Sequence, residues 1–292
     1  MSATTLHPAE AIPRRRAVLL RRIRRQPLPA LGAILLVALV VTAIAAPWIT
    51  THDPFEMNVV DRLQPPGEDY WFGTDAFGRD ILSRTLHGGR VSLAIGLSVA
   101  AASTGIGLVI GVIAGYFRTA DAILMRIMDG LMAIPGILLA IGLMSVTRAS
   151  IGVVIVAITI PEIPRVVRLV RAVVLTVREQ VYIEAASAIG TRFPRLMWKH
   201  ILPNTLAPLI VQATDIAASA VLVESYLSFL GVGTPPEIPS WGNIISEGRL
   251  YVQIAFWNIL FPSLFLGMMV LSINILGDGL RDMLDPRLAR RL

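Results

Sequence analysis

Acidic side chains inside long apolar runs are the residues of this chain that could do chemistry. Glu224 lies in the run VLVESYLSFLGVG, and Asp215 precedes it by nine residues. An ionised carboxylate is costly to bury in an apolar environment, so each must face a cavity, a cation or hydrogen-bond donors. Ser225 and Ser228 beside Glu224 indicate a polar strip that faces a cavity. Glu224, Ser228 and Asp215 are therefore candidates for residues that line or latch such a cavity.

Two other acidic residues, Asp129 and Glu162, lie nearer the ends of their apolar runs. Carboxylates at such positions commonly pair with a basic group of the same bundle. Arg165, Arg168 and Arg171 follow Glu162 at intervals of three residues, which places them on one face of a helix. We expect structural ion pairs here, with at least one arginine extending toward lipid headgroups.

The sequence contains no recognisable catalytic or metal centre. Its four histidines lack the spacing of metal ligands, no serine lies in a nucleophile elbow, and no phosphate-binding GxxxxGK[ST] loop is present. We therefore expect no catalytic residue, no metal and no cofactor bound by this chain. Any use of ATP would need another polypeptide.

The composition is typical of an integral membrane protein. Hydrophobic residues make up 54% of the chain and charged residues 16%, against about 25% charged residues in soluble domains. The net charge of +6 is not gathered in one basic patch but lies at the edges of apolar runs. It indicates membrane topology and lipid contact, and no nucleic-acid partner. The absence of cysteine excludes disulfides and thiolate chemistry.

Six apolar runs are long enough to cross a bilayer as helices, which takes about 20 residues each. They are residues 30–50, 91–116, 124–146, 150–172, 205–230 and 257–279. The arginine-rich start leads into the first run without a convincing cleavage site, so that run is expected to be a retained helix and not a signal peptide.

Charge asymmetry between the connecting segments predicts the orientation. The first 29 residues carry seven arginines against one glutamate, whereas residues 51–90 carry seven acidic residues against four arginines. By the positive-inside rule, both termini and residues 178–204 are expected in the cytoplasm. The predicted organisation is a basic segment (1–29), a first transmembrane helix (30–50), an extracytoplasmic segment (51–90), a core of five transmembrane helices (91–282) and a cytoplasmic tail (283–292).

The second apolar run carries a stripe of small residues. Gly107, Gly111 and Gly115 recur every four residues, and Gly105 lies beside them. Small residues at this spacing let two membrane helices approach closely. We expect a helix–helix contact here and not a ligand site.

A polar segment between two apolar runs, EAASAIGTRFPRLMWKHILPN (184–204), has the pattern of two short helices joined by a turn. Apolar and small residues recur at helical spacing up to Ile189, and Gly190 is placed to end the helix as a left-handed cap. The spacing restarts at Phe193, with Pro194 in the first turn. The small residues would let another protein surface come close. A hairpin at the membrane surface without a partner is the alternative that spacing alone leaves open.

This hairpin resembles the EAA loop of ABC importer permeases, in which Glu-Ala-Ala is followed by Gly at the seventh position and then by Ile-Leu-Pro. WFGTDAFGRDILSRTLHGGRVSL (71–93) resembles the GTDxxGRDxxSRxxxGxRxSL signature of one permease subfamily. Further matches follow in order: RLVR (168–171), HILPN (200–204), ESYLSFLGVG (224–233), PSWG (239–242), GDGLRD (277–282) and DPRL (285–288). Together, over about residues 28–288, they resemble the second permease subunit of dipeptide, oligopeptide and nickel ABC importers, the DppC/OppC type.

The resemblance implies an all-α membrane protein with six transmembrane helices and the type I ABC importer permease fold, with a MetI-like core. It implies a subunit that forms half of a pore for dipeptides or oligopeptides in the bacterial inner membrane. The implied partners are a second permease of the DppB/OppB type, two ATPase subunits of the DppD/DppF or OppD/OppF type that carry ATP and Mg²⁺, and an extracytoplasmic substrate-binding protein.

The resemblance also assigns residues to the loop that contacts the ATPase: Glu184, Ala185, Ala186 and Gly190, with Arg192 beside them. The candidates for the pore or its gate remain those indicated by the residues themselves, Glu224, Ser228 and Asp215.

Three alternatives stay open from the sequence. The first is the same architecture importing nickel, glutathione or another small solute, because specificity in this family rests largely on the binding protein. The second is an intramembrane enzyme, for which no persuasive catalytic pair is found. The third is a proton-coupled secondary carrier, which inverted repeats would support and the sequence does not show. The last two leave the EAA loop unexplained.

Overall fold

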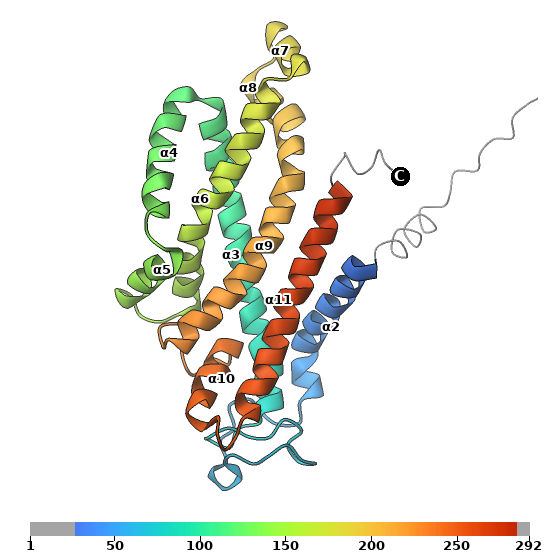
Figure 1. Cartoon of the computed structure of the whole chain (residues 1–292), viewed down its shortest axis with the longest axis vertical. Coiled ribbons are helices and arrows are strands. Elements are labelled where there is room, and N and C mark those ends of the chain that lie inside the picture. Colours follow the sequence, from blue (N-terminus) through green and yellow to red (C-terminus); the bar gives the residue numbers. More distant parts are fainter. Residues whose placement is uncertain (1–26, 285–292) are drawn as a thin grey trace, which may run out of the picture.

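The computed structural model describes residues 27–284, which form a bundle of helices (Figure 1). The long helices are α2 (Pro27–Ile49), α3 (Ile81–Tyr116), α6 (Ile151–Arg178), α9 (Leu202–Phe229) and α11 (Trp257–Leu284). The shorter helices are α4 (Arg118–Met132), α5 (Gly136–Ser145), α7 (Val181–Ala188), α8 (Phe193–Leu196) and α10 (Trp241–Gly248). Single 3-10 turns cover Val59–Asp61 and Arg249–Tyr251, and a π-helical turn covers Met197–Ile201. No strand occurs within residues 27–284.

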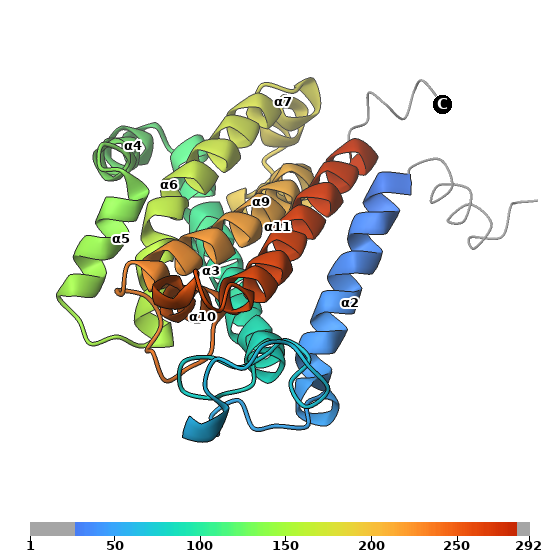
Figure 2. The ribbon, with the colours of Figure 1, turned by 60° about the horizontal axis from the view of Figure 1, so that its bottom comes forward.

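The bundle has two distinct ends. Helices α7 and α8 project from one of them, which we call the α7 end, and α10 covers the other with residues 50–80, which we call the α10 end (Figure 1). Figure 2 shows α4 and α5 at one edge of the bundle and α2 at the opposite edge.

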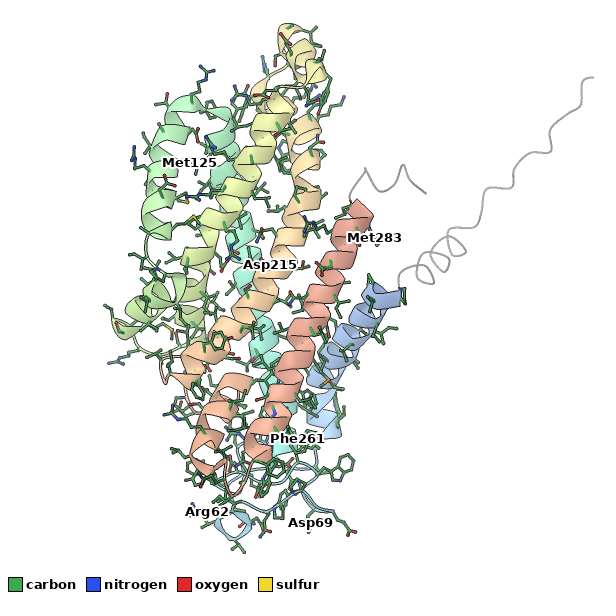
Figure 3. The ribbon with its side chains drawn as sticks, in the orientation of Figure 1. Arg62, Asp69, Met125, Asp215, Phe261 and Met283 are labelled. Atoms are coloured by element: carbon green, nitrogen blue, oxygen red, sulfur yellow. The ribbon has the colours of Figure 1, made fainter. Side chains whose placement is uncertain are left out.

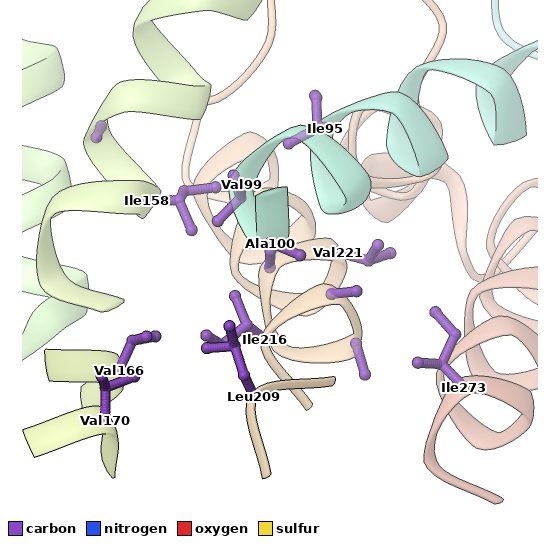
Figure 4. Close-up of a cluster of buried hydrophobic side chains, with 14 of the residues drawn as sticks. Ile95, Val99, Ala100, Ile158, Val166, Val170, Leu209, Ile216, Val221 and Ile273 are labelled. Carbon is purple, nitrogen blue, oxygen red and sulfur yellow. The ribbon is translucent and has the colours of Figure 1, made fainter. Parts of the chain in front are cut away.

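Helix α3 is the centre of the packing, since it contacts α2, α4, α6, α9, α10 and α11. Apolar side chains of several helices meet around it in a buried cluster (Figure 4). Ile95 and Val99 of α3 are buried there, as are Ile158 of α6 and Ile216 of α9. Branched aliphatic residues therefore fill the space between the three helices that carry the polar sites described below.

The small-residue stripe of α3 forms a close contact with α6. A Cβ atom at Gly107, Gly111 or Gly115 would lie 2.5–2.7 Å from the side chain of a valine on α6. The predicted helix–helix contact is thus confirmed for these three glycines. At Gly105 no atom lies within 4 Å of the Cβ position, so Gly105 is not part of the contact.

Four helical stretches are long and apolar enough to cross a membrane: α2, α3, the stretch Phe193–Phe229 and α11. The bent pair of α4 and α5 would make a fifth span. Helix α6 is long enough, but Glu162 and the four arginines of its second half make it too polar to be identified by composition. The predicted total of six spans therefore remains a prediction for α6.

The start of α3 differs from the prediction. The helix begins at Ile81, ten residues before the predicted start at 91, so the end of the predicted extracytoplasmic segment is helical. The side chain of Asp80 accepts hydrogen bonds from the backbone N–H groups of Leu82 and Ser83, which fixes the first turn. Ser83 and Arg84 lower the hydropathy of this first turn. The charge of Arg84 is compensated by ion pairs with Asp75 and Glu247.

The predicted span 124–146 is not one continuous helix. It is divided between α4 and α5, whose axes are bent by 83°. Pro135 has no backbone N–H, and it disfavours the helical conformation at Ile134. The helix therefore stops at Met132 and restarts at Gly136 in a new direction.

Candidate functional site

The helix–turn–helix predicted from residues 184–204 is confirmed at the α7 end. Gly190 adopts a φ of +77°, and its N–H donates to the carbonyl of Ser187 at 3.0 Å. The N–H of Thr191 donates to the carbonyl of Ala186 at 3.1 Å. These two bonds form the Schellman arrangement that ends a helix on a left-handed residue. Nothing lies within 4 Å of the Cβ position of Gly190, so backbone conformation, and not space, calls for glycine there.

The hairpin formed by α7, its turn, α8 and the π-helical turn is anchored to the ends of α3 and α6. Arg178 donates to the carbonyls of Gly115 and Tyr116 at 2.9 and 2.8 Å, which satisfies two free acceptors at the end of α3. The ring of Tyr116 packs edge-on against Phe193 at 4.6 Å between centroids. Arg178 thus ties the end of α6 to the end of α3, and the hairpin follows α6 directly and packs against α3 through Phe193. Its anchoring residues Arg178 and Tyr116 were not singled out from the sequence.

The tip of this hairpin exposes large apolar side chains to the outside of the chain. Val181, Ile189 and Trp198 are 79%, 84% and 76% exposed. Glu184 and Arg192, both predicted site residues, are exposed beside them, and within residues 27–284 neither side chain has a hydrogen-bond or ion-pair partner. Exposed large apolar residues on a projecting hairpin are typical of a surface that another protein covers. Ala185 and Ala186, also predicted site residues, lie on the same helix, and their small side chains leave room for a protein partner to approach.

Glu224, near the α10 end of α9, is enclosed by hydroxyl groups. Its carboxylate accepts hydrogen bonds from Ser240 at 2.8 Å, Ser228 at 2.9 Å, and Ser92 and Thr234 at 3.3 Å each. The residue is 0% exposed, and no basic side chain of residues 27–284 pairs with it. The four donors satisfy the carboxylate without a cation, as burial requires.

The hydroxyl cage joins three parts of the chain. Ser92 comes from α3, Ser228 from α9, and Ser240 is the N-cap of α10. Trp241, the residue after Ser240, donates its ring N–H to the carbonyl of Thr85 of α3 at 2.9 Å. Glu224 and Ser228 thus lie together as expected, but Glu224 reaches no surface of this chain. Its geometry is that of a latch between elements, not of a lining residue.

Asp215 lies apart from Glu224, at mid-length of α9 (Figure 3). Its carboxylate is 3.3 Å from Arg165 of α6, and Arg165 also lies 3.5 Å from Glu162. Arg168 pairs with Asp129 of α4 at 2.6 Å. The expected pairing of Glu162 and Asp129 with arginines is therefore confirmed, and Asp215 belongs to the same set of ion pairs.

Helix α4 is held to the bundle largely by two of these pairs. Arg171 binds Asp121 through two hydrogen bonds, one of them 2.6 Å between Nη2 and Oδ2. Arg168 holds Asp129 two turns further along. Met128 is the only buried residue of α4. Paired charges, more than apolar packing, therefore fix α4 against α6.

A second cluster of charges lies at the α10 end and uses the signature GTDAFGRDILSR. Arg79 lies between Asp75 at 2.6 Å and Glu247 of α10 at 2.5 Å. Arg84 of α3 is 3.3 Å from Asp75 and 3.1 Å from Glu247. All but Glu247 are nearly buried, so the two arginines and two carboxylates compensate one another and tie residues 73–84 to α10.

The turn within this signature depends on its residue types. Asp75 accepts hydrogen bonds from the backbone N–H groups of Phe77 at 2.7 Å and Arg79 at 3.0 Å. Gly78 has a φ of +75°, and a Cβ atom there would lie 1.8 Å from the carbonyl oxygen of Asn58. The signature therefore builds a tight loop from which the Arg79 side chain reaches Glu247 of α10.

Glu247 is the member of this cluster that meets solvent. It lines a cavity of about 170 Å³ together with Phe77, Ile244 and Tyr251. Desolvation by burial raises the pKa of Glu247 to about 7, with the charge of Asp75 acting in the same direction and Arg79 opposing both. This carboxyl group therefore changes its charge near neutral pH. The sequence alone did not single it out, because its partners lie more than 160 positions earlier.

Residues 107–290 match the family described as "Binding-protein-dependent transport system inner membrane component". The chain belongs to this family. Residues 15–66 also match the family "N-terminal TM domain of oligopeptide transport permease C". The chain is thus a transmembrane permease subunit of an ABC importer, as the motifs from the EAA loop to DPRL predicted.

Curated relatives match almost the whole permease. A probable peptide ABC transporter permease protein, y4tQ of Sinorhizobium fredii, is 52% identical over 290 residues, which cover 99% of each chain. The dipeptide transport system permease protein DppC of Alkalihalophilus pseudofirmus is 40% identical and covers 92% of this permease and 88% of its own length.

The fold agrees with a solved importer. The inward-facing MetNI methionine ABC transporter matches 70% of this permease and 98% of its own chain, with a TM-score of 0.59 and 23% identity. The expected type I importer permease fold with a MetI-like core is therefore confirmed. Within residues 27–284 no group of three or more histidine or acidic residues is arranged to hold a metal ion.

Proposed function

We propose that this permease forms half of the path of a peptide importer and transmits the action of ATPase subunits through the hairpin at the α7 end. The observation that carries the proposal is the hairpin itself. It projects from the bundle, exposes Val181, Ile189 and Trp198, follows α6 directly and packs against the end of α3. An exposed apolar tip on a rigid base suits insertion into a cleft of another protein, which can then move both helices.

The partners follow from the family and the relatives. A second homologous permease of the DppB/OppB type completes the path, and two ATPase subunits of the DppD/DppF or OppD/OppF type bind ATP and Mg²⁺. An extracytoplasmic binding protein delivers the solute at the α10 end. Glu184 and Arg192, unpaired within residues 27–284, supply charges for polar contacts with the ATPases, while Ala185 and Ala186 allow close approach.

The orientation is proposed from charge. The arginine-rich start and the basic hairpin segment place both termini and the α7 end in the cytoplasm of a bacterial inner membrane. Within this frame Glu224 and Ser228 latch the extracytoplasmic ends of α3, α9 and α10, and Asp215 faces the path. Peptides are the proposed solutes because the curated relatives carry peptide permease names.

Reconstituted transport tests the proposal. The permease is co-purified with its second permease and ATPases and placed in proteoliposomes with ATP on the α7 side and loaded binding protein on the α10 side. Labelled trialanine is expected to accumulate only when both are present. Accumulation driven by a proton gradient without ATP would instead support a secondary carrier, and nickel uptake without peptide uptake would change the solute class.

A further inference from the structure

Two charged side chains are exposed half-way along the helices that build the bundle. Arg165 is the fifteenth of the 28 residues of α6, and Asp215 is the fourteenth of the 28 residues of α9. Their side chains are 50% and 56% exposed, and their closest atoms are 3.3 Å apart. Figure 3 shows Asp215 about midway between the two ends of the bundle.

Lipid is not a suitable neighbour for this surface. A charged side chain at the centre of a membrane helix costs about 2.5–3.5 kcal/mol on insertion scales. The edge of the bundle formed by α2 differs from the face with Arg165 and Asp215. The exposed side chains in the middle of α2 are apolar, as contact with lipid requires: Ile34, Val37, Val41 and Ile44. The face with Arg165 and Asp215 must therefore meet either water or another subunit.

Polar groups continue from this pair toward the α7 end. The Arg168–Asp129 pair lies one turn along α6 and is also about half exposed. On the other side, a groove of about 230 Å³ between α9 and α11 is lined by Gln212, Asn274 and Asp278 beside Asp215. A row of part-exposed ion pairs from mid-length toward one end fits the wall of an aqueous path better than a packed subunit contact.

We propose that the Arg165–Asp215 pair lines the translocation path and gives a zwitterionic peptide temporary counter-charges at its midpoint. This rests on the proposed function and names the chemistry that the path recognises. The peptide's ammonium group exchanges onto Asp215 while its carboxylate exchanges onto Arg165, whose guanidinium can bind a carboxylate with two hydrogen bonds. The pair can open for this because a half-exposed ion pair with one 3.3 Å contact is weak.

Single cysteines test whether the two charges face water and act on a passing solute. The chain has no cysteine, so Arg165→Cys and Asp215→Cys each place one thiol in it. The assembled transporter is treated with a cationic and with an anionic methanethiosulfonate, and labelling of this chain is followed. Arg165→Cys leaves Asp215 and Glu162 near the thiol and should favour the cationic reagent, whereas Asp215→Cys leaves Arg165 and should favour the anionic one. The ratio of the two rates should shift by about threefold or more in opposite directions, as expected for a unit charge about 4 Å away in a partly aqueous site.

Two further cysteines calibrate the labelling. Ile189→Cys on the exposed hairpin should react, and Val37→Cys on α2 should be protected by lipid. If Arg165→Cys and Asp215→Cys are as unreactive as Val37→Cys, the face is packed against another subunit and the proposal is overturned. If both react without the opposite charge preference, the path is aqueous but the counter-charge role is overturned.

A neutral pair tests the effect on transport. Arg165→Gln combined with Asp215→Asn keeps a hydrogen-bonding pair of similar size and removes both charges. Trialanine imported per ATP hydrolysed is expected to fall about threefold or more, a barrier change of about 0.7 kcal/mol, with assembly unchanged. Unchanged import per ATP would overturn the proposal. A wild-type complex that imports no trialanine would contradict the peptide function, while the labelling ratios would still test the counter-charges without peptide.

Discussion

Glu224 and Glu247 show two ways in which this chain stabilises a largely buried carboxylate. Glu224 accepts hydrogen bonds from four hydroxyl groups and has no basic partner within residues 27–284. Glu247 lies between Arg79 and Arg84 and keeps contact with solvent. The first arrangement is a fixed joint between helices, and the second can change its charge in the neutral pH range.

The raised pKa of Glu247 predicts a pH-dependent contribution to stability. Because the pKa in the folded chain is about 7, above its unfolded value, the folded state binds the extra proton between these two values. The contribution is therefore complete below the unfolded pKa of a glutamate, about 4.3, and is lost as the pH rises through 7. Its full size is on the order of 3–4 kcal/mol, because one pKa unit corresponds to about 1.4 kcal/mol.

Glu247→Gln removes this titration while keeping the shape of the side chain. The thermal midpoint of the purified complex should fall between pH 5.5 and pH 8 by more in the wild type than in this variant. Measuring both melting curves across that range checks the expectation. If the two midpoints change in parallel, the proton is bound elsewhere.

Gly190 and Glu224 differ in how far the sequence could predict them. The cap at Gly190 is a local feature, because its hydrogen bonds join residues within five positions of one another. The cage of Glu224 brings together Ser92 and Ser240, which lie 132 positions before it and 16 after it. Sequence spacing therefore indicated that Glu224 is special, but the polar strip it indicated is a closed cage and not an open cavity.

Among the helices, the contact between α3 and α6 depends most on residue size. The Cβ position of Gly111 is 2.7 Å from the Cβ atom of Val170 and 2.9 Å from the carbonyl oxygen of Val167. A methyl group there must push the two helices apart. At Gly105 on the same helix, the same methyl group would meet nothing within 4 Å.

Gly111→Ala is therefore expected to destabilise the permease, and Gly105→Ala is its matched control. Overpacking of this kind costs about 1–3 kcal/mol, whereas the control loses nothing and gains up to about 1 kcal/mol of helix propensity. Thermal unfolding of the two variants in detergent measures the difference. Equal midpoints would show that the close approach of α3 and α6 is not required.

Helix boundaries were predictable where hydropathy and capping residues indicate the same position. They were not predictable where contacts with residues distant in the sequence determine the boundary. The stripe of glycines predicted the α3 contact because small residues have few other uses at that spacing. The early start of α3 was missed because Arg84 lowers the local hydropathy, and its compensation by Asp75 and Glu247 is visible only in the structure. The division of α4 from α5 had a sequence signal in Pro135, which a count of apolar residues overlooks.

For the whole molecule, the positive-inside rule predicts the orientation of the bundle. A reporter fused after Arg195, in the hairpin, is expected to be cytoplasmic, and one fused after Gly67 is expected outside. Alkaline phosphatase and green fluorescent protein fusions give opposite signals on the two sides and check both positions. A cytoplasmic signal at Gly67 would contradict the proposed topology, including the place given to the binding protein.

Coupling through the hairpin is the central property proposed for the molecule. Gly190→Val cannot adopt a φ of +77° without strain, so the second half of the hairpin would leave the α7 end in another direction. Asparagine tolerates this conformation, so Gly190→Asn is the matched control.

The most direct test is the number of trialanine molecules imported per ATP hydrolysed by the reconstituted transporter. Complexes with Gly190→Asn are expected to behave like the wild type. Complexes with Gly190→Val are expected either to lose the ATPases on purification or to hydrolyse ATP without import, with import per ATP at least about tenfold lower, a loss of about 1.4 kcal/mol of coupling. Wild-type association and wild-type import per ATP in the Gly190→Val complex would contradict the coupling role of the hairpin.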